Sequence, residues 1–60
     1  MINSNIRLML VEDHKLMRVG LKSLFEEQDG LEVTSEANNG HDAIEKFKTT
    51  HPDVTLMDIG

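Results

Sequence analysis

The chain has 60 residues, enough for at most one small domain, and its eleven acidic and six basic side chains give a formal net charge of −5. It contains no cysteine, which excludes a disulfide framework and a thiolate metal site. The acidic balance argues against nucleic-acid binding by this segment and favours a cation or a basic partner surface, although the same charge also serves solubility alone. The apolar runs are too short to span a bilayer and the N-terminus lacks the features of a signal peptide, so we expect a cytoplasmic protein without membrane contact.

The first half of the chain changes from a strand pattern to a helix pattern across a pair of acids. Residues 6–11 are nearly all apolar, as in a buried strand, and Glu12 and Asp13 follow them directly. Apolar side chains then recur at helical spacing over residues 15–28. Asp29 and Gly30 indicate a turn that ends this helix.

The second half repeats the same succession of elements. Apolar and polar residues alternate over 31–37, which predicts an edge strand with one weakly apolar face. The residues Asn38, Asn39 and Gly40 predict a turn and a helix start, and the segment 51–53 with its proline predicts the helix end. A third apolar run over 54–57 indicates a strand that Asp58 interrupts.

The predicted order of strand, helix, strand, helix, strand indicates an α/β fold with parallel strands. A path from the first strand to the second, and then back past the first to the third, gives the strand order 2-1-3. Right-handed crossovers then place the two helices on opposite faces of the sheet. In that order the third strand lies at an edge, where Val54, Leu56 and Met57 would meet water. Long hydrophobic edges recruit other strands, so we expect a homo-oligomer paired through the third strand or the uncovered sheet face, or else a largely disordered monomer.

Three acids stand at the ends of strands that this order makes neighbours. Glu12 and Asp13 follow the first strand and Asp58 ends the third, so their carboxylates should converge at the carboxyl edge of the sheet, where open α/β sheets bind ligands. Three hard oxygen donors suit Mg²⁺ or Mn²⁺. Each acid alone has an ordinary explanation, as a helix-opening or turn residue, and it is their conjunction that favours a metal site.

Three segments of the chain resemble the receiver domain of two-component response regulators: LMLVEDHKLMRVGLKSLF, EANNGHDAIEKF and HPDVTLMDIG. The likeness covers nearly the whole chain and is closest to the subfamily that carries a helix-turn-helix DNA-binding domain further on. It implies one partial receiver domain over residues 1–60 without an effector domain. It also implies the βαβαβ half of a flavodoxin-like, doubly wound parallel sheet.

The resemblance assigns a role to each strand-end residue. Asp58 matches the phosphoacceptor, Asp13 the direct metal ligand, Glu12 the partner acid that holds the metal, and Gly60 the position whose backbone carbonyl completes the Mg²⁺ or Mn²⁺ site. Glu12 departs from the commoner aspartate, and its longer arm could alter metal affinity. Such domains take phosphate from a sensor histidine kinase and are not enzymes in their own right; DNA would be bound only by the missing C-terminal domain. His14, like the other two histidines, is expected to have only a surface role.

Other interpretations remain open at this point. The family also uses a Ser or Thr and a Lys after later strands, which this chain lacks, so we expect the piece to be impaired in phosphotransfer. It could instead be a structural, self-associating half-domain. A phosphatase of the haloacid dehalogenase type would want a second aspartate where Gly60 stands, and a nucleotide-binding unit would need a glycine-rich loop after the first strand.

Overall fold

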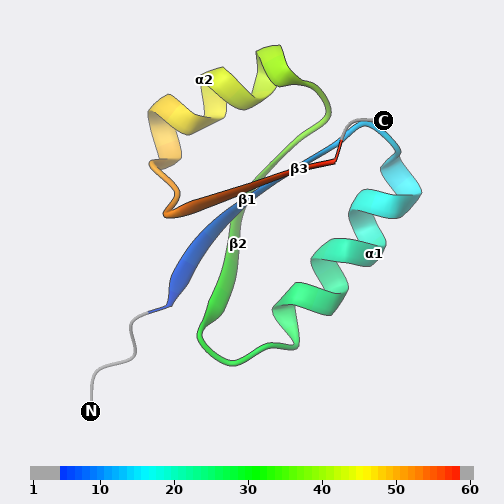
Figure 1. Cartoon of the computed structure of the whole chain (residues 1–60), viewed down its shortest axis with the longest axis vertical. Helices are drawn as coiled ribbons and strands as arrows, with labels where there is room; N and C mark the ends of the chain where they lie inside the picture. Colours follow the sequence, from blue (N-terminus) through cyan, green and yellow to red (C-terminus); the bar gives the residue numbers. More distant parts are fainter. Residues whose placement is uncertain (1–4, 59–60) are drawn as a thin grey trace.

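The computed structural model describes residues 5–58, which form three parallel strands alternating with two helices (Figure 1). The elements are, in chain order, β1 (Ile6–Glu12), α1 (Lys15–Glu26), β2 (Leu31–Ala37), α2 (Gly40–Thr50) and β3 (Val54–Asp58). The sheet order is β2-β1-β3, and both pairings are parallel. The predicted α/β class and the 2-1-3 strand order are therefore confirmed.

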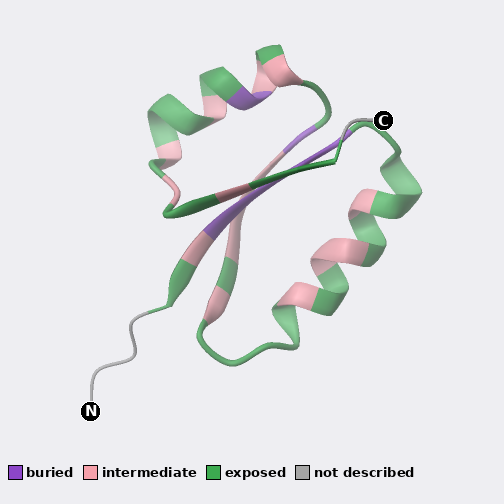
Figure 2. Ribbon diagram, in the orientation of Figure 1, coloured by how far each residue is buried: buried purple, intermediate pink, exposed green. Residues whose placement is uncertain are grey.

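The two helices lie on opposite sides of the sheet, with β1 between them (Figure 1). Alternate residues of a strand point to opposite faces. Met9 and Val11 of β1 accordingly form a buried cluster with Ala37 of β2 and Ala43 of α2. The other buried apolar residues of the strand point the opposite way, toward α1, so that β1 is covered on both faces and forms the core of the molecule (Figure 2).

The second strand departs from the prediction of a single apolar face. Its pairing with β1 shifts register between Leu8 and Met9, so that Val33 lies opposite Leu8 while Ser35 lies opposite Met9. Thr34 is the extra residue of this bulge, and its hydroxyl donates to the carbonyl of Leu8 at 3.3 Å. Because paired residues of parallel strands share a face, Leu31 and Val33 lie on the α1 face with Leu8, whereas Ser35 and Ala37 lie on the α2 face with Met9 and Val11.

Element boundaries differ from the prediction at the ends of β1 and α1. β1 includes Glu12, which forms the last pair of the β1–β3 ladder with Asp58. Helix α1 ends at Glu26, two residues early, and its last turn tightens as Glu27 and Gln28 donate to carbonyls three residues back. Gly30 then turns the chain into β2 with a φ of 82°, a conformation that favours glycine.

Helix α2 begins and ends as the sequence indicates. The side chain of Asn39 accepts the backbone N–H of Asp42 at 2.8 Å and so caps the first turn. At the other end His51 adopts the left-handed conformation with a φ of 48° and donates its N–H to Phe47.

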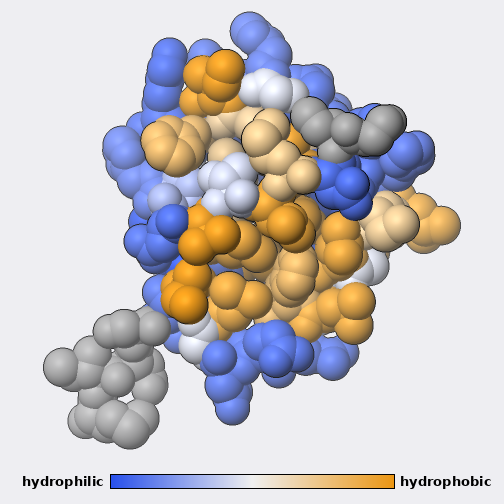
Figure 3. All heavy atoms as spheres, in the orientation of Figure 1, coloured by the Kyte–Doolittle hydropathy of each residue, from blue (hydrophilic) through white to orange (hydrophobic). Residues whose placement is uncertain are grey.

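Strand β3 is the exposed edge of the sheet. Val54, Leu56 and Met57 are all exposed, as predicted for an edge strand with apolar residues. Apolar side chains also gather into a broad surface on the side of the molecule shown in Figure 3.

Between residues 5 and 58, neither helix has the length and apolar character needed to cross a bilayer.

Candidate functional site

The carboxyl edge of the sheet brings two strand ends together in fixed register. β1 and β3 pair from Leu8↔Val54 through to Glu12↔Asp58, without a shift. The phosphoacceptor candidate and the first acid of the pair are thus opposite each other on neighbouring strands. Paired residues of parallel strands point to the same face, so both side chains leave the sheet on one side.

Glu12 is buried although it is charged, with only 2% of its surface exposed. Its Oε2 accepts the backbone N–H of His14 at 2.8 Å and lies 3.1 Å from Nδ1 of the same residue. Its backbone carbonyl accepts Nη1 of Arg18 at 2.8 Å. A buried carboxylate needs such partners, because desolvation without them is costly. These contacts hold the end of β1 in one conformation.

Asp13 and His14 complete a close group of donor atoms next to Glu12. Nδ1 of His14 lies 3.0 Å from Oδ1 of Asp13, and one ligand atom from each of the three residues lies within 4.8 Å of the others. The hydrogen bond to Glu12 and the negative charges of Asp13 and Glu12 raise the pKa of His14 above its ordinary value. His14 is exposed, as predicted, but its contact with both acids was missed; its position directly after them was the available signal.

The structure unites only part of the predicted metal site. Asp58 is exposed at the end of β3, opposite Glu12, and does not belong to the group formed by Glu12, Asp13 and His14. Gly60 lies outside the described residues, so its predicted carbonyl contribution stays a prediction. The sequence thus located the sheet edge and the neighbouring strands, whereas the close group contains an imidazole in place of the third carboxylate.

The charge at this edge is favourable for a cation. Within residues 5–58, no lysine or arginine forms an ion pair with Glu12, Asp13 or Asp58. The guanidinium of Arg18 is directed to the Glu12 carbonyl and to the Glu36 carboxylate, at 3.5 Å from the latter. Carboxylate oxygens are the donors that Mg²⁺ and Mn²⁺ prefer, and Asp13 and Asp58 are open to water, so the residues present fit such an ion. His14 is the one basic partner of Glu12 and Asp13 among the described residues.

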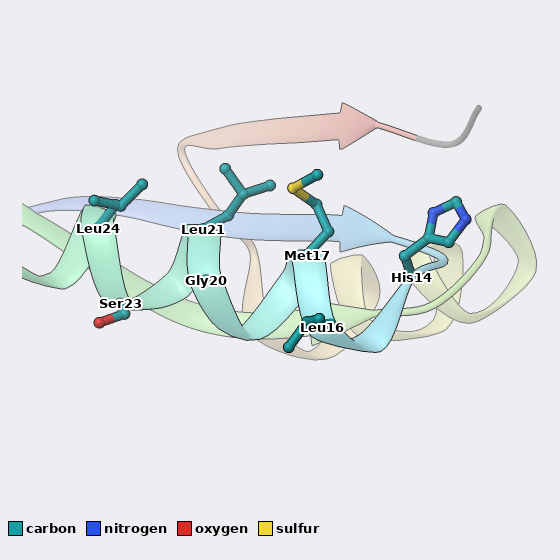
Figure 4. A pocket seen from close by; sticks show the side chains of 7 residues that line it. All are labelled: His14, Leu16, Met17, Gly20, Leu21, Ser23 and Leu24. Carbon is teal, nitrogen blue, oxygen red and sulfur yellow. The ribbon is translucent and has the colours of Figure 1, made fainter.

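A second feature near the site is an apolar hollow along α1 (Figure 4). Met17, Leu21 and Leu24 point to one side of the helix, whereas Leu16 and Ser23 point away from it (Figure 4). The hollow meets the acidic edge only through His14. It lacks a convergent set of polar groups, so we place the chemistry at the sheet edge and not here.

Comparison with known proteins agrees with this geometry. The family model described as the response regulator receiver domain matches residues 8–60. The chain belongs to this family. Among solved structures no match was found.

Individual relatives of this receiver domain include response regulators and a methylesterase/glutaminase. The chain is 39% identical over 54 residues to response regulator GacA of Pseudomonas viridiflava and 41% identical over 54 residues to response regulator UvrY of Escherichia coli, covering 90% of this chain each time. It is 33% identical over 57 residues, 95% of its length, to a protein-glutamate methylesterase/protein-glutamine glutaminase of Methanosarcina mazei.

The matched region is a small part of these relatives. The chain spans 25% of the length of the first two proteins and 16% of the third. The shared segment is therefore the receiver domain, and relatives with different names have it in common.

Proposed function

We propose that this receiver domain accepts a phosphoryl group on Asp58 from the phosphohistidine of a sensor histidine kinase. The observation that supports the proposal is the Glu12↔Asp58 pair at the carboxyl edge of the sheet, with Asp13 beside it. Asp58 is exposed, as a side chain must be that receives a group from another protein. The chain would act as a phosphoacceptor and not as an enzyme with a substrate of its own.

Glu12, Asp13, Asp58 and the backbone carbonyl of Gly60 would hold one Mg²⁺ or Mn²⁺. The buried carboxylate of Glu12 would fix one side of the site, and Asp13, whose side chain is 41% exposed, would exchange its contact with His14 for the ion. When bound, the cation would neutralise charge on the phosphoryl oxygens and the acids.

Asp58 supplies the nucleophile. One carboxylate oxygen attacks phosphorus in line with the phosphorus–nitrogen bond of the donor histidine. The new oxygen–phosphorus bond forms as that bond breaks, which leaves an acyl phosphate on Asp58 and frees the kinase imidazole. The register of β3 against β1 sets where this oxygen stands relative to Glu12.

In the whole protein, we propose that phosphorylation of this domain controls transcription in the cytoplasm through a helix-turn-helix DNA-binding domain. The support is the resemblance to that subfamily. The net negative charge of this segment disfavours contact with DNA, which fits DNA binding by another part of the protein.

Mass spectrometry after incubation with Mg²⁺ and a small acyl phosphate tests the phosphoacceptor role. The expected product carries one phosphoryl group, even if it forms slowly, and Asp58→Asn does not form it. Asp29→Asn is the matched control, because Asp29 is an acid in the turn between Glu26 and Leu31, outside the sheet edge. Addition of phosphate to the Asp58→Asn chain would contradict the assignment.

A second candidate function is self-association, which the exposed edge strand β3 favours. β3 has β1 as its sole partner strand among the described residues, and its apolar side chains are exposed. We propose that two copies pair through β3 or the sheet face beside it, because exposed apolar edge strands recruit further strands.

A further inference from the structure

The start of β3 is tied to β1 by two residues outside the acidic edge. The β1–β3 ladder begins at Leu8↔Val54. Just before it, the backbone N–H of Asp53 donates to the carbonyl of Arg7 at 2.7 Å, and the backbone N–H of Arg7 donates to Oδ2 of Asp53 at 2.9 Å. The Asp53 carboxylate therefore serves as the acceptor for an N–H group that lies ahead of the first ladder pair.

The side chain of Arg7 extends this link to helix α2. Its Nη1 donates to the carbonyl of His51 at 2.6 Å, and its Nη2 donates to the carbonyl of Thr50. The last carbonyls of a helix have no partner inside the helix and form the negative end of its dipole, so a guanidinium suits them well. Only His51, Pro52 and Asp53 separate the end of the helix from β3. Arg7 thus fixes both the end of α2 and the point where the chain returns to the sheet.

The register of β3 depends on few other contacts. Its apolar side chains are 37–53% exposed and it has one neighbouring strand among the described residues, whereas register is strongly specified only where a face is buried. A slip of one residue would turn every side chain of β3 to the opposite face and separate Asp58 from Glu12.

We propose that Arg7 and Asp53 are positioning residues, which set the register of β3 and thereby hold Asp58 opposite Glu12 at the far end of the strand. The effect on register stands by itself. The effect on metal binding and phosphate acceptance rests on the proposed function.

Amide hydrogen exchange and cross-strand nuclear Overhauser contacts in the 60-residue chain test the proposal. In Asp53→Ala, exchange protection of β3 amides should fall about 2- to 10-fold, the loss expected for one hydrogen bond, while β2 amides keep theirs. Asp53→Asn retains a side-chain oxygen acceptor and should restore most of the protection. Asp29→Ala, which removes an acid from a turn, is the matched control and should behave as the unmodified chain.

Mg²⁺ affinity, followed through the amide resonances of Asp13 and Asp58, supplies the second readout. It should fall with β3 protection in Asp53→Ala and recover in Asp53→Asn. Unchanged β3 protection, or equal loss in β2 and β3, would overturn the proposal, because the latter indicates general destabilisation. If the unmodified chain does not bind Mg²⁺, the proposed metal site is refuted. The cross-strand contacts between β1 and β3 would still decide whether Asp53 sets the register.

Arg7→Lys gives an independent test that does not depend on Asp53→Ala remaining folded. It keeps the positive charge and the backbone bonds but removes the fork that contacts two carbonyls. We expect β3 protection to fall about 2- to 10-fold here as well. If Arg7→Lys has the same β3 protection as the unmodified chain, the guanidinium does not help to set the register.

Discussion

Leu10 of β1 and Leu56 of β3 are the same residue type, paired directly across neighbouring strands, yet their surroundings differ sharply. Leu10 is 0% exposed and Leu56 is 37% exposed. The central strand is held by both helices and carries Glu12 at its end, whereas the edge strand is thinly covered and carries Asp58. The comparison teaches that the proposed metal ligand Glu12 stands at the end of the well-covered central strand, whereas the proposed phosphoacceptor Asp58 stands at the end of an edge strand with exposed side chains.

The largest effect should come from truncating the buried member of the pair. Leu10→Ala should lower the free energy of unfolding by about 2–5 kcal/mol, because it leaves a cavity between tightly packed side chains. Leu56→Ala is the matched control and should cost clearly less, since its side chain is partly in water already. Urea unfolding followed by circular dichroism measures both. Equal losses of unfolding free energy in the two variants would contradict the difference in burial between β1 and β3.

Charging the exposed member should next affect assembly. If copies of the chain pair through β3, Leu56→Lys should dissolve the oligomer, because a charge on an edge strand opposes pairing, and should unfold the chain at the same time. Sedimentation equilibrium and circular dichroism over a dilution series give the result. A control is Leu16→Lys on the exposed surface of α1, away from β3. An unmodified chain that stays monomeric and folded at low micromolar concentration would refute the pairing.

Removing one carboxylate from either strand should weaken cation binding. Asp13→Asn and Asp58→Asn should each lower Mg²⁺ affinity by about tenfold or more, an effect of the size that even supporting contacts of a metal site produce. Calorimetric titration with Mg²⁺ and Mn²⁺ measures the change, with Asp29→Asn as the control. If only Asp13→Asn weakens binding, the ion is held by the residues at the end of β1 without Asp58, and the two strands do not share it.

The smallest expected effect concerns His14, which contacts both Glu12 and Asp13. An imidazole at these carboxylates competes with a cation for their oxygens. His14→Ala should therefore raise Mg²⁺ affinity about 1.5- to 5-fold, in proportion to the modest energy of an exposed ion pair. The same titration measures it, with His41→Ala on α2 as the control. A loss of affinity would instead make His14 a ligand.

Much of this arrangement could be predicted from the sequence, because strong local patterns dictate it. The apolar run before Glu12 and the alternation of strand and helix signals predicted a parallel sheet with helical crossovers. The rule that parallel strands end at one edge then placed Glu12, Asp13 and Asp58 there. These inferences need only the character of each segment and do not depend on individual side-chain conformations.

The contacts that escaped prediction depend on geometry that no local pattern encodes. The bond from Arg7 to the Asp53 side chain joins residues 46 positions apart. The contact of His14 with Glu12 depends on how the chain turns after β1. The early end of α1 follows from a tightened last turn, which the helical spacing of Phe25 and Gln28 does not reveal.

The bulge at Thr34 has a consequence for how β2 is compared between proteins. The bulge reverses which face of the sheet the odd-numbered residues of β2 occupy. Val33 shares its face with Leu8, and two positions later Ser35 shares the opposite face with Met9. A relative without the extra residue would present its side chains in one unbroken alternation. An alignment gap placed one position too early or too late would then exchange the α1-facing and α2-facing positions of half the strand. For β2, similarity between relatives has to be judged separately on each side of Thr34.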